Sequence, residues 1–284
     1  MRPELAAFLG SWDFRPDVLV VLTLLGAGYV LGWTQVRRAD PRALPAWRLS
    51  CYVGGLLSIA IALLSPLDTF SELLFLMHMA QHVVLIMLAA PLLLLGNPLP
   101  AFLWAFPESV RRRAGRFLAP GGGGHVLMRR LTWMPGVWVL YVVNLWAWHH
   151  PAAYGAALRN AWVHDAEHLA FFLTAILFWW PVINPAPQPW GFIPYGFRIF
   201  YVLGAALQNT FLSALITLSD RVIYSHYTSV PRVWGLTVSE DQMMAGLIMW
   251  LPGGMMYMAT ILILVARMLS REERITEAHF NSAP

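Results

Sequence analysis

The chain alternates between long runs without a charged residue and short segments rich in arginine. Seven runs contain no Asp, Glu, Arg or Lys, and they cover 18–36, 49–67, 73–107, 131–158, 168–197, 199–219 and 242–266. Each run is at least as long as the roughly 17–20 residues that a helix needs to cross the hydrocarbon layer of a bilayer. The pattern therefore predicts an all-α polytopic membrane protein with seven transmembrane helices, forming a single domain over 1–284.

Proline and glycine predict where the longer runs stop being helical, because proline has no backbone N–H and does not continue a helix. We expect helix ends or interruptions near Gly96, Pro151, Pro181 and Pro252–Gly254. The last of these lies inside the seventh run and predicts a kink with freed carbonyl groups. Between the third and fourth helices, about 97–130 is expected to form a flexible cytoplasmic loop, and 268–284 a short cytoplasmic tail.

Composition supports the membrane assignment and excludes several classes of protein. Hydrophobic residues make up 58% of the chain and charged residues 12%, whereas a soluble chain carries about 25% charged residues. A soluble enzyme, a disordered tail and a nucleic-acid module are therefore excluded. The single cysteine, Cys51, excludes an intrachain disulfide and a Cys-x-x-Cys site.

The distribution of arginine predicts the orientation. Every basic residue is Arg, and seven crossings place 14 of the 19 on one face and 5 on the other. The larger group consists of Arg37, Arg38, Arg42, Arg48, Arg111, Arg112, Arg113, Arg116, Arg129, Arg130, Arg198, Arg267, Arg271 and Arg274. By the positive-inside rule this face is cytoplasmic, so the N-terminus is expected outside and the C-terminus inside.

With this threading, seven of the nine histidines fall near the outer face. His78 and His82 are four residues apart on the third helix, and His164 and His168 repeat that spacing on the fifth. An i, i+4 pair projects both imidazoles from one helix face, and ionisable groups inside an apolar helix normally mark a functional site. The two pairs together predict a metal site whose four imidazoles come from two helices.

Further residues near the same face are candidate supporting ligands or charges, namely His149, His150, Glu167, Asp220, Asp241, Met79 and Met244. Imidazole suits copper and zinc, and thioether suits Cu(I). His149 and His150 equally fit an interfacial aromatic belt, since they follow Trp146 and Trp148, and methionine is a common filler of gaps in a core. Nothing in the pattern decides between these interpretations.

Other chemistries also fit parts of the pattern. The sequence from His164 to His168 matches the H-x-x-E-H pattern of inverted zincin proteases, although a third-ligand motif is missing. Histidines on two helices also suit haem, and several histidine boxes occur in di-metal hydroxylases. Polar residues on the sixth helix, such as Gln208 and Asn209, suit a cation path, but they stop about halfway across the membrane.

Several motifs together resemble the seven-helix CtaG family, the assembly factors of caa3-type cytochrome c oxidase. The matching segments, in order, are Met77–His82 followed by Ala90–Gly96, then Trp148–His149, His164–His168, Phe178–Pro181, Ser219–Tyr224, Asp241–Gln242 and Gly246–Trp250. The resemblance covers about 50–265. It implies a bacterial plasma-membrane protein that is needed to mature a haem–copper oxidase by handling the copper of its buried centre.

Spacing and resemblance combine into one hypothesis of function. The chain is expected to be a non-enzymatic copper-binding assembly factor that holds Cu(I) between His78, His82, His164 and His168. It would receive copper from a periplasmic or extracellular donor and pass it to the oxidase subunit with the copper site. A haem-binding factor, a purely structural factor and a cation transporter remain the alternatives.

Overall fold

The computed structural model describes residues 10–281, and its regular structure is helical throughout. Helices account for 79% of it, with no strand within this range. The elements are α2 (Pro16–Ala39), α3 (Ala46–Leu64), α4 (Pro66–Ser71), α5 (Phe75–Val83), the π-helical η1 (Val84–Ala89), α6 (Ala90–Leu95), α7 (Pro98–Ala105), α8 (Glu108–Leu118), α9 (Gly123–Leu131), α10 (Met134–Trp148), α11 (Pro151–Arg159), α12 (Ala161–Ile183), α13 (Tyr195–Thr217), the 3-10 turn η2 (Ser225–Thr228) and α14 (Val238–Asn281). The all-α prediction is confirmed, whereas the predicted position of the N-terminus lies outside the described residues.

Six helices are long and apolar enough to cross a membrane. They are α2, α3, the continuous helix Phe75–Leu95 made of α5, η1 and α6, then α12, α13 and α14. The fourth predicted run is divided into α10, which has 15 residues, and α11. His150 is extended, as residues before proline tend to be, and α10 ends at Trp148. Six spans are therefore supported by length and composition, and the predicted seventh is not confirmed.

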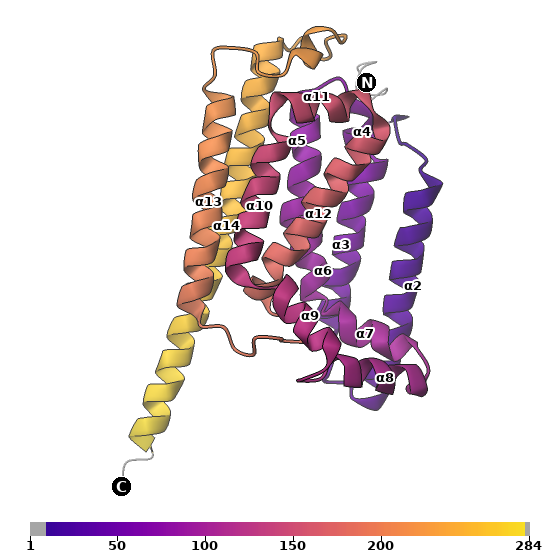
Figure 1. Cartoon of the computed structure of the whole chain (residues 1–284), viewed down its shortest axis with the longest axis vertical. Coiled ribbons are helices and arrows are strands. Elements are labelled where there is room, and N and C mark those ends of the chain that lie inside the picture. The colour runs from indigo at the N-terminus through magenta and orange to yellow at the C-terminus, as the bar shows by residue number, and fades with distance from the viewer. Residues whose placement is uncertain (1–9, 282–284) are drawn as a thin grey trace.

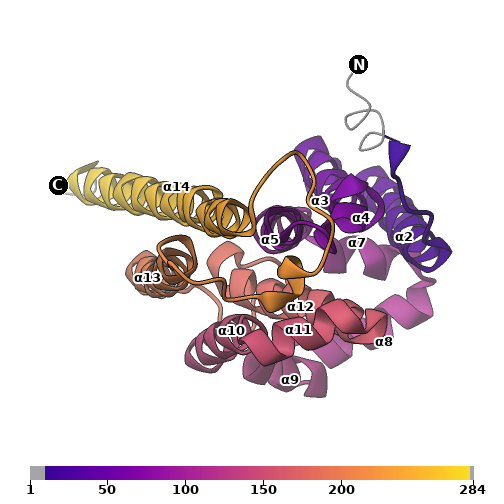
Figure 2. The same ribbon diagram turned by 90° about the horizontal axis from the view of Figure 1, so that it is seen from above.

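The long helices run side by side along the longest axis of the molecule (Figure 1). In the view from above, α13 and α14 form a closely packed pair beside α5, while α12 lies between α10 and the group of α3 and α5 (Figure 2). We call the end that carries α4 and α11 the histidine end, and the end that carries α8 and α9 the arginine end. The described part of the chain enters α2 at the histidine end and leaves α14 beyond the arginine end (Figure 1).

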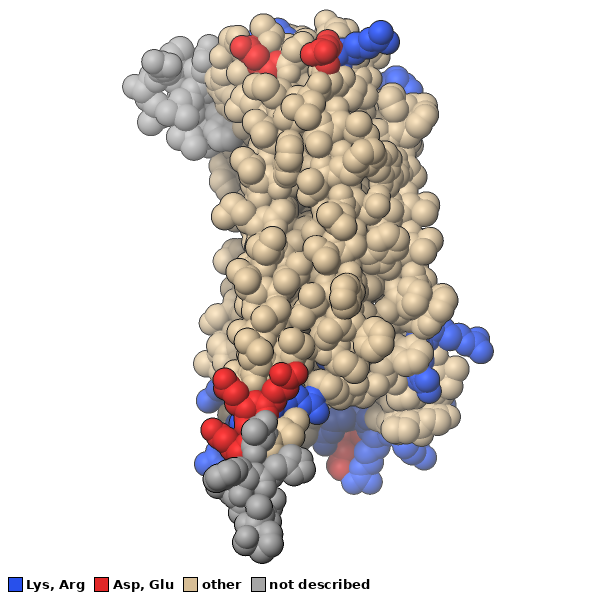
Figure 3. All heavy atoms as spheres, turned by 90° about the vertical axis from the view of Figure 1, so that its left-hand side faces the viewer, with Lys and Arg blue, Asp and Glu red and all other residues tan. Residues whose placement is uncertain are grey.

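Charged side chains gather at the two ends of the bundle. On the face drawn in Figure 3, an uncharged belt separates the acidic and basic groups of one end from those of the other. Exposed leucines such as Leu24, Leu207 and Leu262 lie along the long helices. An apolar surface of this extent suits hydrocarbon as its solvent, and the helices satisfy their own backbone hydrogen bonds there. The surface therefore agrees with a membrane protein.

The segment 97–130, expected to be a loop, contains the short helices α7, α8 and α9 at the arginine end (Figure 1). α7 packs against α2 so closely that a Cβ added to Gly32 would lie 1.7 Å from the carbonyl oxygen of Ala101. Only glycine permits that approach of two backbones. The contact between α2 and α7 holds α2 against the rest of the bundle.

Glycine and proline affect the helices in three different ways. Gly96 caps the helix that ends at Leu95, as expected, and α12 ends at Ile183, two residues after Pro181. α14 continues through Pro252 without an interruption. There, the Asn209 side chain of α13 donates a hydrogen bond of 2.9 Å to the carbonyl oxygen of Met249, in the turn before the proline. A neighbouring helix thus supplies a partner for a backbone carbonyl group near the proline.

Candidate metal centre

Four imidazole rings converge near the histidine end, two from each of two neighbouring helices. α5 carries His78 and His82, and α12 carries His164 and His168. Ring centroids lie 4.4 Å apart within the first pair and 4.2 Å within the second, and 5.0, 5.7 and 5.1 Å apart for His78–His164, His78–His168 and His82–His168. The i, i+4 spacing places each pair on one helix face. The structure brings together all four histidines that were predicted as ligands.

The nitrogen atoms at the centre of the cluster are close enough to share one ion. His78 Nε2 and His82 Nε2 lie 2.9 Å apart, and two ligands at about 2.0–2.1 Å from one ion lie about 2.9 Å apart when their bonds meet at a right angle. Glu167 Oε2 lies 3.5 Å from His78 Nε2, and its Oε1 lies 4.0 Å from His82 Nε2. All three side chains are buried, so the carboxyl group can provide negative charge beside a bound cation.

Many polar atoms of the cluster have no hydrogen-bond partner within residues 10–281. They are His78 Nδ1, His82 Nδ1, His164 Nε2, His168 Nε2 and both carboxylate oxygens of Glu167. Buried polar atoms are nearly always paired in folded proteins, and leaving one unpaired is costly. Imidazole nitrogens and a carboxylate are the donors that bind copper and zinc, so this set fits a metal ion.

The ligand atoms group into three overlapping sets. Within each set the atoms lie within 4.8 Å of one another, and the sets are His78, His82 and His168; His78, His164 and Glu167; and Asp68, His164 and His168. His168 belongs to two of them, which makes the cluster one continuous group of donors. The cluster is therefore larger than a single four-histidine cage.

Asp68 and Gln81 were not predicted as site residues. Gln81, fully buried on α5, donates from Nε2 to the Asp68 carboxylate and to the carbonyl oxygen of Ala62. Burial raises the pKa of the Asp68 carboxyl to about 6, and the hydrogen bond from Gln81 lowers it in part. The signal in the sequence was a glutamine inside an apolar helix, next to His82. Nothing in the sequence indicated that α4 would fold back over this position.

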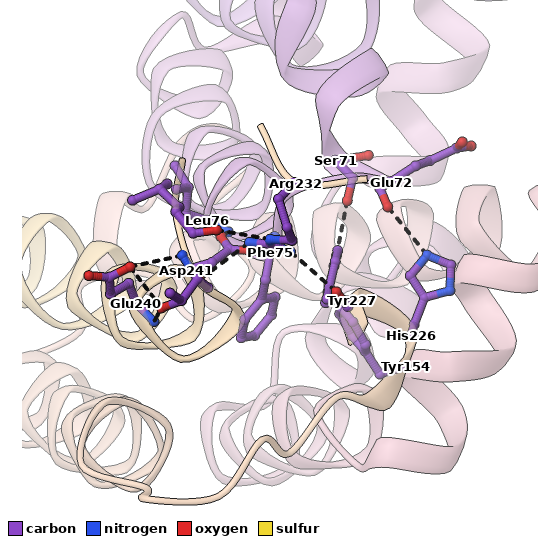
Figure 4. A network of polar contacts seen from close by, with 12 residues as sticks. Ser71, Glu72, Phe75, Leu76, Tyr154, His226, Tyr227, Arg232, Glu240 and Asp241 are labelled. Atoms are coloured by element: carbon purple, nitrogen blue, oxygen red, sulfur yellow. Dashed lines mark hydrogen bonds and ion pairs between the residues drawn. The ribbon is translucent and has the colours of Figure 1, made fainter. Parts of the chain in front are cut away.

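Local capping fixes where the two histidine-bearing helices begin. The Asn160 side chain accepts hydrogen bonds from the backbone N–H groups of Trp162 and Val163, which starts α12 just before His164. At α5, the two carboxylate oxygens of Asp241 on α14 accept from the N–H groups of Phe75 and Leu76, each at 3.0 Å (Figure 4). Both histidine pairs therefore lie within the first two turns of well-anchored helices.

The segment that contains η2 covers the start of α5. Tyr227 donates to the carbonyl oxygen of Ser71 at 2.9 Å, and its hydroxyl is 2.7 Å from that of Tyr154 on α11 (Figure 4). The ring of Tyr154 lies 5.0 Å from that of His78. Tyr154 and Tyr227 are both buried. This tyrosine pair closes the cluster on the side of α11.

The two histidines after α10 differ in their surroundings. His149 is buried, and its Nδ1 lies 2.8 Å from the carbonyl oxygen of Leu145. That bond fixes the proton on Nδ1 and leaves Nε2 as an acceptor, which has no partner among the described residues. His150 is exposed, and its Nδ1 accepts from the N–H of Ala152 at the start of α11. The Nε2 atom of His149 is therefore available to bind a metal ion, whereas the side chain of His150 caps the start of α11.

The other predicted supporting residues lie at different distances from the imidazoles. Asp241 binds the start of α5, and one of its oxygens lies 3.3 Å from Arg232. Met79 is fully buried in the hydrophobic core, Met244 is exposed on α14, and Asp220 is exposed after α13. Among these four, Asp241 has the clearest structural link to the cluster, because it positions the helix that carries His78.

Comparison with known proteins agrees with the resemblance noted in the motifs. A family model described as "Cytochrome c oxidase caa3 assembly factor" matches residues 27–271. An uncharacterized protein of Mycobacterium leprae is 26% identical over 288 residues, which are 96% of this chain and 42% of that protein. Uncharacterized proteins of Mycobacterium bovis and Mycobacterium tuberculosis are each 26% identical over 98% of this chain and 43% of their own length. The chain thus spans less than half of these relatives, and no solved structure matches it.

Proposed function

The chain belongs to the CtaG family of cytochrome c oxidase caa3 assembly factors, and on that premise we propose that it binds copper at its histidine end. It hands that copper to a copper site of the oxidase inside the membrane. Copper is the cargo here and is bound by exchange of ligands. No covalent bond of a substrate is made or broken, so the proposed role is not enzymatic.

The observation that carries this proposal is the convergence of four imidazoles with unpartnered ring nitrogens from α5 and α12. Neutral imidazole is a good ligand for copper, including the cuprous ion. His164 and His168 supply their unpartnered Nε2 atoms, and His78 and His82 supply the Nε2 atoms that lie 2.9 Å apart. Glu167 provides the compensating negative charge. A buried, partly unsatisfied polar cluster is expensive for an apolar bundle to maintain, which argues that it is kept for binding.

The proposed transfer uses the position of the cluster within the bundle. A donor outside the cell delivers Cu(I) at the histidine end, and the ion then moves sideways to the oxidase subunit. Because the cluster lies inside the helical bundle, a recipient centre that is also buried in the membrane is at a similar depth. The ion is thereby transferred to the oxidase subunit without being released into water.

The topology that this transfer requires is part of the same proposal. We place the histidine end outside the plasma membrane and the arginine end in the cytoplasm, by the positive-inside rule. α10 forms the seventh crossing, since it is apolar and runs between the two ends beside α12 and α13 (Figure 1). At 1.5 Å per residue it is about 22 Å long, and local thinning of the bilayer accommodates a short span.

Metal analysis of the purified protein tests the proposal. Loaded with Cu(I) and passed through a desalting column, the wild-type protein is expected to retain copper, and the double variant with His78→Ala and His82→Ala is expected to lose it. The matched control is His150→Ala with His226→Ala, which removes two imidazoles outside the cluster. Full copper retention by the first double variant would disprove the ligand assignment.

The same samples distinguish the alternatives. The imidazole rings of α5 and α12 are 5.0–5.7 Å apart between centroids, so a porphyrin between them would have to separate the two helices. A Soret absorption band in the purified protein would show that the ligand is haem and not copper. Copper flux into vesicles that contain the protein would instead support a transporter.

A further inference from the structure

We infer that the copper ion occupies two positions in succession, an entry position formed by Asp68, His164 and His168 and a deeper position formed by His78, His82 and His168. This inference rests on the proposed copper-binding function and adds a route to it. His168 takes part in both positions and acts as the ligand that passes the ion inward.

Geometry supports two positions because the ligand atoms of each set lie within 4.8 Å of one another. The sets share His168, so an ion that moves from one to the other keeps one ligand throughout. A move that retains a ligand never exposes a bare ion to the apolar interior, which would be very costly. The ring of His164 lies 5.0 Å from that of His78, and the ring of His168 lies 5.1 Å from that of His82, which keeps the step short.

Burial gives the route a direction. Asp68 and His164 are partly exposed, whereas His78, His82 and His168 are buried. The entry set is therefore the one that an ion from solution reaches first. The deeper set is enclosed by the buried rings of Tyr154 and Phe171, which lie 5.0 Å from His78 and 4.6 Å from His82.

The two positions also differ in the chemistry of their ligand atoms, and this difference agrees with movement from the entry position to the deeper one. The entry position includes a carboxylate, whose negative charge attracts a cation but which matches copper less well than imidazole does. The deeper position has three imidazoles, which favour copper over magnesium or calcium. The nearby carboxylate of Asp165 is already paired with Arg15 at 2.8 Å, so Asp68 is the carboxylate that faces His164 and His168 at the entry position. Glu167 lies beside His78 and His82 at the deeper position.

The variant Asp68→Asn tests the entry position. Asparagine keeps an oxygen that can accept the hydrogen bond from Gln81, so the local fold is retained while the charged ligand is lost. Transfer of Cu(I) from its coloured complex with bicinchoninate is followed as loss of absorbance. We expect the uptake rate of this variant to fall about tenfold, in line with the 10–100-fold effects of groups around metal sites, with copper retained at equilibrium in the deeper position.

Two further variants make the outcome decisive. Glu72→Gln removes an exposed carboxylate at the same end and is expected to load at the wild-type rate. His82→Ala is expected to take up copper quickly and to lose it on desalting. Wild-type uptake kinetics in Asp68→Asn would overturn the entry position while leaving the copper site intact. A wild-type protein that retains no copper would instead contradict the proposed function itself.

Discussion

The carboxylates around the histidine cluster act differently because their surroundings differ. Asp241 is fully buried and gives both oxygens to backbone N–H groups of α5. Glu167 is equally buried, yet its oxygens have no hydrogen-bond partner among residues 10–281. Asp68 is partly exposed and is held by Gln81. The carboxylate of Asp241 therefore stabilises a helix, whereas Glu167 and Asp68 have oxygens available for a cation.

Replacing Asp241 with alanine is expected to lower stability strongly. The change leaves the N–H groups of Phe75 and Leu76 buried without their acceptor, and each such loss costs about 1–3 kcal/mol. The apparent melting temperature in detergent should fall well below that of the wild type, and copper retention should weaken because α5 carries His78. Asp220→Ala, which removes an exposed carboxylate at the same end, should melt like the wild type. Equal melting of the two variants would refute the capping role.

Spacing within a helix made the histidine pairs predictable, whereas contacts between helices did not follow from it. His78 with His82 and His164 with His168 share a face because four residues complete about one helical turn. That these faces meet depends on which helices are neighbours, and this was a hypothesis until the structure placed the rings 5.0–5.7 Å apart. Asp68 reaches the cluster through the fold of α4, so no local pattern indicated it.

At the level of helices, the runs without charge predicted six long helices well. The fourth run predicted a longer helix than the structure contains. Pro151 and the extended His150 end the fourth helix early and turn the rest of that run into α11. The π-helical segment η1, which begins two residues after His82, was also not predicted. There, the Trp179 side chain donates a hydrogen bond to the carbonyl oxygen of Ile86 at 2.9 Å. π-Helical segments often occur near functional sites.

Gly32 is expected to be essential for the packing of α2 on α7. In Gly32→Ala, the new Cβ would lie 1.7 Å from the carbonyl oxygen of Ala101, so the two backbones must separate. We expect a lower melting temperature and faster proteolysis between α2 and α3. Gly254→Ala on α14 is the matched control, because a Cβ there meets no atom within 4 Å. If both substitutions have the same small effect, the close α2–α7 contact is not required.

At the level of the whole molecule, the distribution of charge and the direction of the chain agree. The arginine end carries α8 and α9 with most of their arginines exposed, and the uncharged belt separates it from the histidine end (Figure 3). The start of α2 and the end of α14 lie toward opposite ends (Figure 1), which requires an odd number of crossings in a flat bilayer. The proposed topology meets this requirement by adding α10 as a seventh crossing to the six helices of sufficient length.

Labelling of single cysteines tests both the α10 crossing and the orientation. In a Cys51→Ser background, Arg113→Cys places a thiol on α8 and Trp162→Cys places one at the start of α12, where the tryptophan is 84% exposed. A membrane-impermeant maleimide added to intact cells is expected to label position 162 at once and position 113 only after lysis. Because these positions flank α10, labelling of both from outside would mean that α10 does not cross. Labelling of position 113 alone would keep the crossing and reverse the orientation, which would move the histidine cluster to the cytoplasmic side and exclude an external copper donor.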